Sequence, residues 1–72
     1  MEKVQTMMDA VAIGDRLRRL RGSRSQKEVA DALGVTAMAI SLYETGQRIP
    51  SDEMKLKIAN YYNRSVAFIF YK

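Results

Sequence analysis

Apolar residues recur at three- and four-residue intervals along most of the chain, which is the period of a helix with one buried face. In the first such segment, Ile13, Leu17 and Leu20 fall on one stripe. Asp9 stands just before it and is a favourable N-cap residue, because its carboxylate can accept the free amides at the start of a helix. We therefore predict a first helix from about Ala10 to Arg21.

Two further helices are predicted on either side of a glycine. The second helix begins after Ser25, in the sequence Ser-Gln-Lys-Glu, which is typical of a capping box. Gly34 ends it, because glycine readily adopts the left-handed conformation found at helix C-termini. Thr36 then caps a third helix that runs to Thr45 and stops at Gly46. The predicted buried face of the second helix consists of Val29, Ala30 and Leu33.

Each of the last two predicted helices begins at a serine. Ser51 precedes Asp52 and Glu53, and the helix dipole favours acidic residues in a first turn. Ser65 caps a short final helix. The residues expected to face inward on the fourth helix are Met54, Ile58, Ala59 and Tyr62. No stretch shows the sustained alternation of a strand, so the predicted fold class is all-α with five helices.

The composition narrows the possible chemistry. The chain has 72 residues, enough for one domain, and contains neither cysteine nor histidine. Disulfides, cysteine- or histidine-ligated zinc and catalysis by these side chains are therefore excluded. No apolar run approaches the roughly 20 residues that cross a bilayer, and the first residues lack the apolar core of a signal peptide. We expect a cytoplasmic protein with no cofactor, no metal, no membrane contact and no enzymatic activity.

The net charge of +4 is unevenly distributed. The segment from Ile13 to Lys27 contains a single acid, Asp15, among six basic residues: Arg16, Arg18, Arg19, Arg21, Arg24 and Lys27. Such a cluster favours a polyanionic partner such as nucleic acid. The alternative is a solvated helix face, and we expect two of the first three arginines to lie on one.

The segment from Gln26 to Thr45 gives the strongest indication of function. Two helices joined by a short turn that contains glycine are the signature of a helix-turn-helix. Ala30 is small where the third helix would cross closely over the second, Gly34 supplies the positive φ of the turn, and Ile40 is apolar where the third helix would enter the core. This combination predicts a sequence-specific binder of double-stranded DNA.

The chain resembles the Cro/C1 repressor-type helix-turn-helix family, also called the XRE family, in the runs IGDRLRRLR, SQKEVADALGV, AISLYETGQRIPS and IANYYNRSVAFIF. The resemblance covers about residues 13–70. It implies a compact lambda-repressor-like DNA-binding domain whose second helix lies across the DNA backbone and whose third enters the major groove, commonly as a dimer on a near-palindromic operator. Residues 1–12 are expected to form an N-terminal arm or a helical extension.

The resemblance also implies particular DNA contacts. Gln26 matches a glutamine that binds a DNA phosphate and braces the recognition helix. The base-contacting positions are Ala37, Met38, Ser41 and Leu42. Ser41 is the only polar residue among them, so we expect the others to pack on thymine methyl groups, unless Met38 or Leu42 covers the domain's own surface. The phosphate-contacting positions are Arg24, Gln26, Lys27, Thr45, Gln47 and Arg48, of which Gln26 and Lys27 also have the free amides of a helix start.

Two more expectations concern the domain itself. By resemblance, Glu44 should point inward and form an ion pair with Arg21. The apolar C-terminal tail predicts a homodimer interface made of Val66, Phe68, Ile69, Phe70 and Tyr71. The alternative is that two of Val66, Ile69 and Phe70 close the core of the same chain.

The predicted function is that of a transcriptional regulator, in particular a repressor. Two alternatives remain on the same scaffold. One is an antitoxin or a restriction-modification controller with a second protein partner. The other is a protein-interaction module that no longer binds DNA, an alternative that the apolar outer face of the third helix keeps open.

Overall fold

The computed structural model describes residues 9–71, and these contain five helices and no strand. The helices are α1 (Ala10–Arg21), α2 (Gln26–Leu33), α3 (Ala37–Glu44), α4 (Asp52–Tyr62) and α5 (Val66–Phe70). The predicted all-α class and helix order are confirmed. Most of the predicted N-terminal arm, residues 1–8, lies outside the described residues, while residues 10–12 belong to the first turn of α1.

Every helix begins at the side-chain cap that the sequence predicts. Asp9 accepts hydrogen bonds from two backbone amides of α1, and a serine or threonine hydroxyl caps each later helix: Ser25, Thr36, Ser51 and Ser65. The ends of the helices are likewise determined by single residues close by in the sequence. Gly34 (φ 74°) and Asn63 (φ 58°) adopt the left-handed conformation after α2 and α4. Only α3 differs slightly from expectation, ending at Glu44 with Thr45 as its C-cap.

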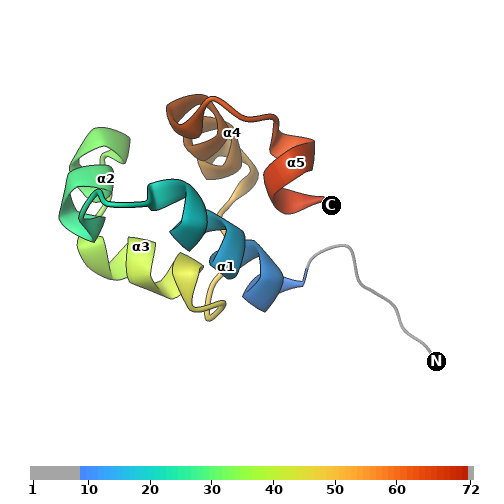
Figure 1. The fold of residues 1–72 in the computed structure, drawn as a ribbon, viewed down its shortest axis with the longest axis horizontal. Coiled ribbons are helices and arrows are strands. Elements are labelled where there is room, and N and C mark those ends of the chain that lie inside the picture. Colours follow the sequence, from blue (N-terminus) through green and yellow to red (C-terminus); the bar gives the residue numbers. More distant parts are fainter. Residues whose placement is uncertain (1–8, 72) are drawn as a thin grey trace.

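The central helix of the domain is α1. Figure 1 shows α1 running between α3 on one side and the α4–α5 pair on the other, with α2 at the far end of α3. Side chains from all five helices form one core, which consists of Ile13, Leu17, Val29, Ala30, Leu33, Ile40, Tyr43, Ile58, Ala59, Tyr62, Ile69 and Phe70. Leu20 and Met54, both expected on inward faces, pack against this core from its edge.

The crossing of α1 over α3 depends on a glycine. A Cβ atom added at Gly14 would lie 2.7 Å from the carbonyl oxygen of Tyr43 and equally close to the carbonyl carbon of Glu44. Because both obstacles are backbone atoms, no side-chain rotation could relieve the overlap. The absence of a side chain at Gly14 therefore lets the two helices pack backbone to backbone.

The short C-terminal helix is held by contacts with the rest of the domain. Ile69 and Phe70 are completely buried, so these two residues belong to the core of their own chain and cannot be part of the predicted dimer surface. Arg16 of α1 donates a hydrogen bond to the carbonyl oxygen of Ile69. Lys55 is also buried, although its charge gave no reason to expect this. Its Nζ lies 3.1 Å from the hydroxyl of Tyr71, which follows α5.

Among residues 9–71, no helix is both long and apolar enough to span a membrane.

Candidate DNA-binding surface

A tight turn fixes α3 against α2. Only three residues separate the two helices, and the backbone N–H of Val35 donates to the carbonyl of Ala30 across this turn (3.0 Å). Ala30 is 1% exposed and Ile40 is 4% exposed, because the two helices pack on each other at these positions. The structure thus has the helix-turn-helix that the spacing of the sequence predicts.

The outer face of α3 is exposed and poor in polar groups. Ile40, Tyr43 and Glu44 form its buried face. The opposite stripe consists of the four predicted base-contacting residues and Thr45, the C-cap: Ala37, Met38, Ser41, Leu42 and Thr45. Met38 is 67% exposed, which places its side chain in solvent and contradicts the alternative in which it covers the domain's own surface. Ala37 and Thr45 are also exposed, and Ser41 and Leu42 are half-buried.

The start of α2 lies beside α3, to which Gln26 is hydrogen-bonded through Glu44. The first intrahelical bond of α2 joins the amide of Val29 to the carbonyl of Ser25, and the hydroxyl of Ser25 accepts the amide of Glu28 (2.9 Å). The amides of Gln26 and Lys27 precede both bonds, at the positive end of the helix dipole, where anions such as phosphate bind. Lys27 is exposed and forms an ion pair with Asp31 one turn further along (3.0 Å).

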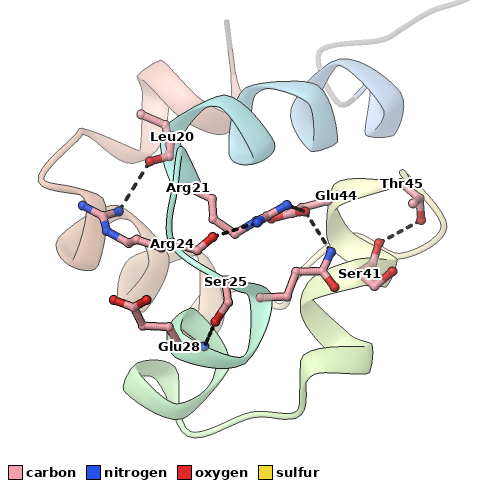
Figure 2. Close-up of polar contacts among 9 residues, drawn as sticks. Leu20, Arg21, Arg24, Ser25, Glu28, Ser41, Glu44 and Thr45 are labelled. Carbon is pink, nitrogen blue, oxygen red and sulfur yellow. Dashed lines mark hydrogen bonds and ion pairs between the residues drawn. The ribbon is translucent and has the colours of Figure 1, made fainter.

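A buried carboxylate connects α1, α2 and α3. Glu44 has a 3% exposed side chain, and Arg21 approaches it with two nitrogens: Nε lies 2.6 Å from Oε2 and Nη2 lies 3.0 Å from Oε1. Gln26 Nε2 donates to the same Oε1 at 3.1 Å. Figure 2 shows the Arg21 and Glu44 side chains facing each other between α1 and α3. Glu44 therefore has the inward orientation and the arginine partner that the family resemblance implies.

This carboxylate also acts on neighbouring groups. Its hydrogen bonds raise the pKa of Arg21 above the ordinary value. Arg21 uses its remaining nitrogen, Nη1, to donate to the carbonyl oxygen of Arg24 (2.8 Å), just before α2. The network thus fixes both the side chain of Gln26 and the backbone that leads into it. The sequence predicts the ion pair by resemblance, but the convergence of Arg21 and Gln26 on one carboxylate is visible only in the fold.

The position of Arg24 differs from the DNA phosphate contact predicted for it. Its guanidinium lies over the rings of Tyr61 (5.3 Å) and Tyr62 (5.5 Å) at the end of α4. Figure 2 shows this side chain directed away from Ser41 and Thr45 on α3. The geometry therefore assigns Arg24 to packing between the α1–α2 connection and α4. Two adjacent aromatic residues in α4 are the only sequence signal for this contact.

The basic residues of α1 also have partners within the domain. Asp15 pairs with Arg18 (3.4 Å) and with Arg19 (3.0 Å), and both arginines are well exposed. Arg16 is half-buried and bonds to α5. Two of the three arginines, Arg18 and Arg19, thus lie on a solvent face, as predicted from the sequence, and Asp15 partly balances their charge.

The loop after α3 extends the exposed surface. The amides of Gln47 and Arg48 both donate to the carbonyl of Leu42 (3.0 and 3.2 Å), which folds the loop back against the end of the helix. Gln47 Nε2 donates to the hydroxyl of Thr45 (3.0 Å). Arg48 is exposed at the edge of the α3 face. A cation and two polar side chains thus flank an apolar centre.

The part of the chain that the structure describes contains no group of three or more acidic residues that could hold a metal ion. The surface around α3 is built from one exposed helix, a helix N-terminus and flanking cations. An arrangement of this kind binds the major groove and the adjacent phosphates of DNA. The fold and the surface together define a helix-turn-helix DNA-binding protein.

Comparison with known proteins places the chain in a family. The model of a family described as helix-turn-helix matches residues 16–69, so the chain belongs to this family of Cro/C1-type (XRE) regulators. No curated protein gives a significant match to the chain. The chain is a DNA-binding transcriptional regulator.

Two solved structures resemble the whole fold. One is the restriction-modification controller protein C.AhdI from Aeromonas hydrophila, with 33% identity and a TM-score of 0.77 over 86% of this chain and 93% of that one. The other is the clp gene regulator ClgR from C. glutamicum, with 25% identity and a TM-score of 0.73 over 92% of this chain and 86% of that one. Proteins of this family are regulators rather than enzymes.

Proposed function

We propose that the protein is a repressor that binds a near-palindromic operator as a homodimer in the cytoplasm. The observation that carries this proposal is the exposed outer face of α3 beside the N-terminus of α2. The buried network around Glu44 supports it, because that network holds Gln26 in place before any DNA is present. Contacts that are fixed in advance cost less conformational entropy on binding.

In the proposed complex, the DNA backbone and the bases contact different parts of this surface. Phosphates on one side meet the start of α2, at Gln26 and Lys27, and those on the other side meet Thr45, Gln47 and Arg48. The base edges lie against Ala37, Met38, Ser41 and Leu42 on α3. Arg24 is left out of the proposed contacts because its guanidinium packs on two tyrosines of α4.

The proposed dimer interface consists of the apolar side chains of α5 and Tyr71 that are not covered by the rest of the domain. Phe68 is 40% exposed and Tyr71 is 43% exposed, and Val66 lies half-buried beside them. To read two half-sites, such a dimer must place its two α3 helices on the same side, about one DNA turn of 34–36 Å apart.

Selection of bound duplexes from a random DNA pool by the full chain tests the proposal. A single enriched site with two inverted half-sites is the expected result. Binding that selects no sequence and disappears at moderate salt would contradict it, because such binding comes from phosphates alone. Repression is tested separately, by placing the selected site across a promoter that drives a reporter gene.

Sedimentation of the chain with and without its selected site tests the dimer. We expect two chains per site and a shift to monomer when Phe68→Glu places a charge in the patch. Leu56→Glu is the matched control, since Leu56 is an exposed apolar residue of α4 outside the proposed patch. One chain per site in the wild type would refute the dimer.

A controller of a restriction-modification system is the second candidate. The similarity to C.AhdI, at 33% identity over most of both chains, favours it. Such a controller is expected to bind a site upstream of its own coding sequence, with methylase or restriction genes adjacent. A selected site that occurs only beside unrelated genes would remove this candidate and leave the general regulator.

A further inference from the structure

The outer face of α3 has few groups that can form hydrogen bonds with bases. Its exposed stripe contains no amide, guanidinium or carboxylate, and its only polar side chains are the hydroxyls of Ser41 and Thr45. Within the domain the Thr45 hydroxyl donates to the carbonyl of Ser41 (2.9 Å) and accepts from Gln47 (3.0 Å), and in the proposed complex Thr45 meets a phosphate instead of a base. Ser41 is therefore the polar side chain of α3 that remains for base recognition.

The rest of the stripe is apolar: Ala37 and Met38 project outward, and Leu42 is half-buried. Met38 is 67% exposed, Ala37 precedes it, and Leu42 lies one turn further along. Met38, Leu42 and Thr45 share one side of the helix, because residues three and four apart are neighbours on a helix surface. The part of α3 that would enter the groove thus consists mainly of a flexible thioether and two aliphatic side chains.

The major groove offers one apolar group for such a surface. Among the four standard bases, only thymine presents a methyl group there, on C5. 5-Methylcytosine presents the same methyl group at the same place. We propose that α3 reads the C5 methyl group of pyrimidines, so that 5-methylcytosine can replace thymine in the operator and cytosine methylation strengthens binding. The proposal rests on the proposed function, since it names the chemical feature that the DNA-binding surface recognises.

The hydroxyl of Ser41 does not distinguish thymine from 5-methylcytosine. Thymine presents a hydrogen-bond acceptor at position 4, whereas cytosine and 5-methylcytosine present an amino donor. A serine hydroxyl can donate to the first or accept from the second. An arginine at the same place would have a fixed preference, because a guanidinium only donates. Ser41 therefore leaves discrimination to the methyl group.

The test changes the DNA and needs no variant that could fail to fold. Each thymine of the half-site selected by the full chain is replaced in turn by deoxyuridine, which lacks only the methyl group. At one or more positions near the helix we expect affinity to fall about three- to fivefold, the factor that corresponds to one buried methyl group. Cytosine at that position should bind about as weakly as deoxyuridine, and 5-methylcytosine should recover at least about threefold over cytosine.

Two protein variants assign the effect to α3. In Met38→Ala, the ratio of the affinities for the thymine and deoxyuridine duplexes should fall toward one. Since Met38 is exposed, the substitution leaves the core intact. Lys27→Ala is the control: loss of a phosphate contact should weaken all duplexes equally and preserve the methyl dependence.

The outcomes separate this inference from the proposed function. Sequence-selective binding with equal affinity for thymine and deoxyuridine at every position would overturn the methyl reading and leave the regulator intact. A loss with deoxyuridine and no gain with 5-methylcytosine would also overturn it, because the surface would then distinguish the two bases by their polar groups. Failure to select any sequence would overturn the proposed function, and the inference with it.

Discussion

The carboxylate of Glu44 joins three helices, and its replacement by glutamine is the sharpest test of how the DNA-binding surface is held. Both oxygens of Glu44 accept hydrogen bonds: Oε2 accepts one from Arg21, and Oε1 accepts one from Arg21 and one from Gln26. In the Glu44→Gln variant one oxygen becomes an amide nitrogen. Whichever way the amide turns, a donor then faces a donor, and Arg21 loses its counter-charge.

The magnitude follows from burial. Breaking a buried ion pair by removing one partner costs about 3–5 kcal/mol, because the other charge remains uncompensated. The Arg21 side chain is 17% exposed and can regain some hydration. We therefore expect the free energy of unfolding to fall by about 2–3 kcal/mol, less than for a fully buried arginine. For a domain of this size, that corresponds to a decrease in Tm of roughly 10–20 °C.

Thermal and urea denaturation followed by circular dichroism measure the change, with Asp15→Asn as the matched control. Asp15 also carries one negative charge and contacts two arginines, but these pairs are exposed. Its loss should change stability by less than about 1 kcal/mol. The double variant Arg21→Met/Glu44→Leu should be more stable than Glu44→Gln, because no unpaired charge remains. Equal Tm values for Glu44→Gln and the wild type would refute the reasoning.

Three other predictions follow from single positions. Gly14→Ala should destabilise the fold by about 3 kcal/mol or more in urea denaturation, because the added Cβ would overlap backbone atoms of α3. Gly34→Ala is the control and should cost only about 1–2 kcal/mol, because Gly34 has a left-handed φ and open space around it. Equal effects of the two substitutions would contradict the close packing of α1 on α3. Burial raises the pKa of Tyr62 to about 12, above the ordinary value of 10.0, so its contribution to stability is complete below pH 10 and is lost as the pH rises toward 12. Tyr62→Phe should flatten that alkaline decline in unfolding free energy, and an unchanged pH profile would assign the decline to other groups. Arg48→Ala should reduce the slope of log affinity against log salt by about one while leaving the selected sequence unchanged, and a changed sequence preference would instead indicate a base contact.

Much of the fold was determined by the sequence itself, because its signals are local. A helix start needs a side-chain oxygen within three residues of a free amide, and Asp9 and Ser25 supply one each. The stripe of Ile13, Leu17 and Leu20 requires only that residues three and four apart share a face. The turn at Gly34 likewise depends on one residue's φ. These rules predict the helices, their order and the helix-turn-helix without knowledge of what packs on what.

The burial and the partners of individual side chains were decided by the tertiary structure. Ile69 and Phe70 have the same apolar character as Phe68, and only the position of α1 and α4 around α5 determines that the first two are covered and the third is exposed. Arg24 was expected to contact a DNA phosphate and nothing in the sequence marked Lys55 as a buried residue, yet the fold stacks Arg24 on tyrosines and buries Lys55 beside Tyr71. Burial and pairing depend on which other helix approaches. That information is spread over residues far apart in the chain, and it is available only when the helices have packed.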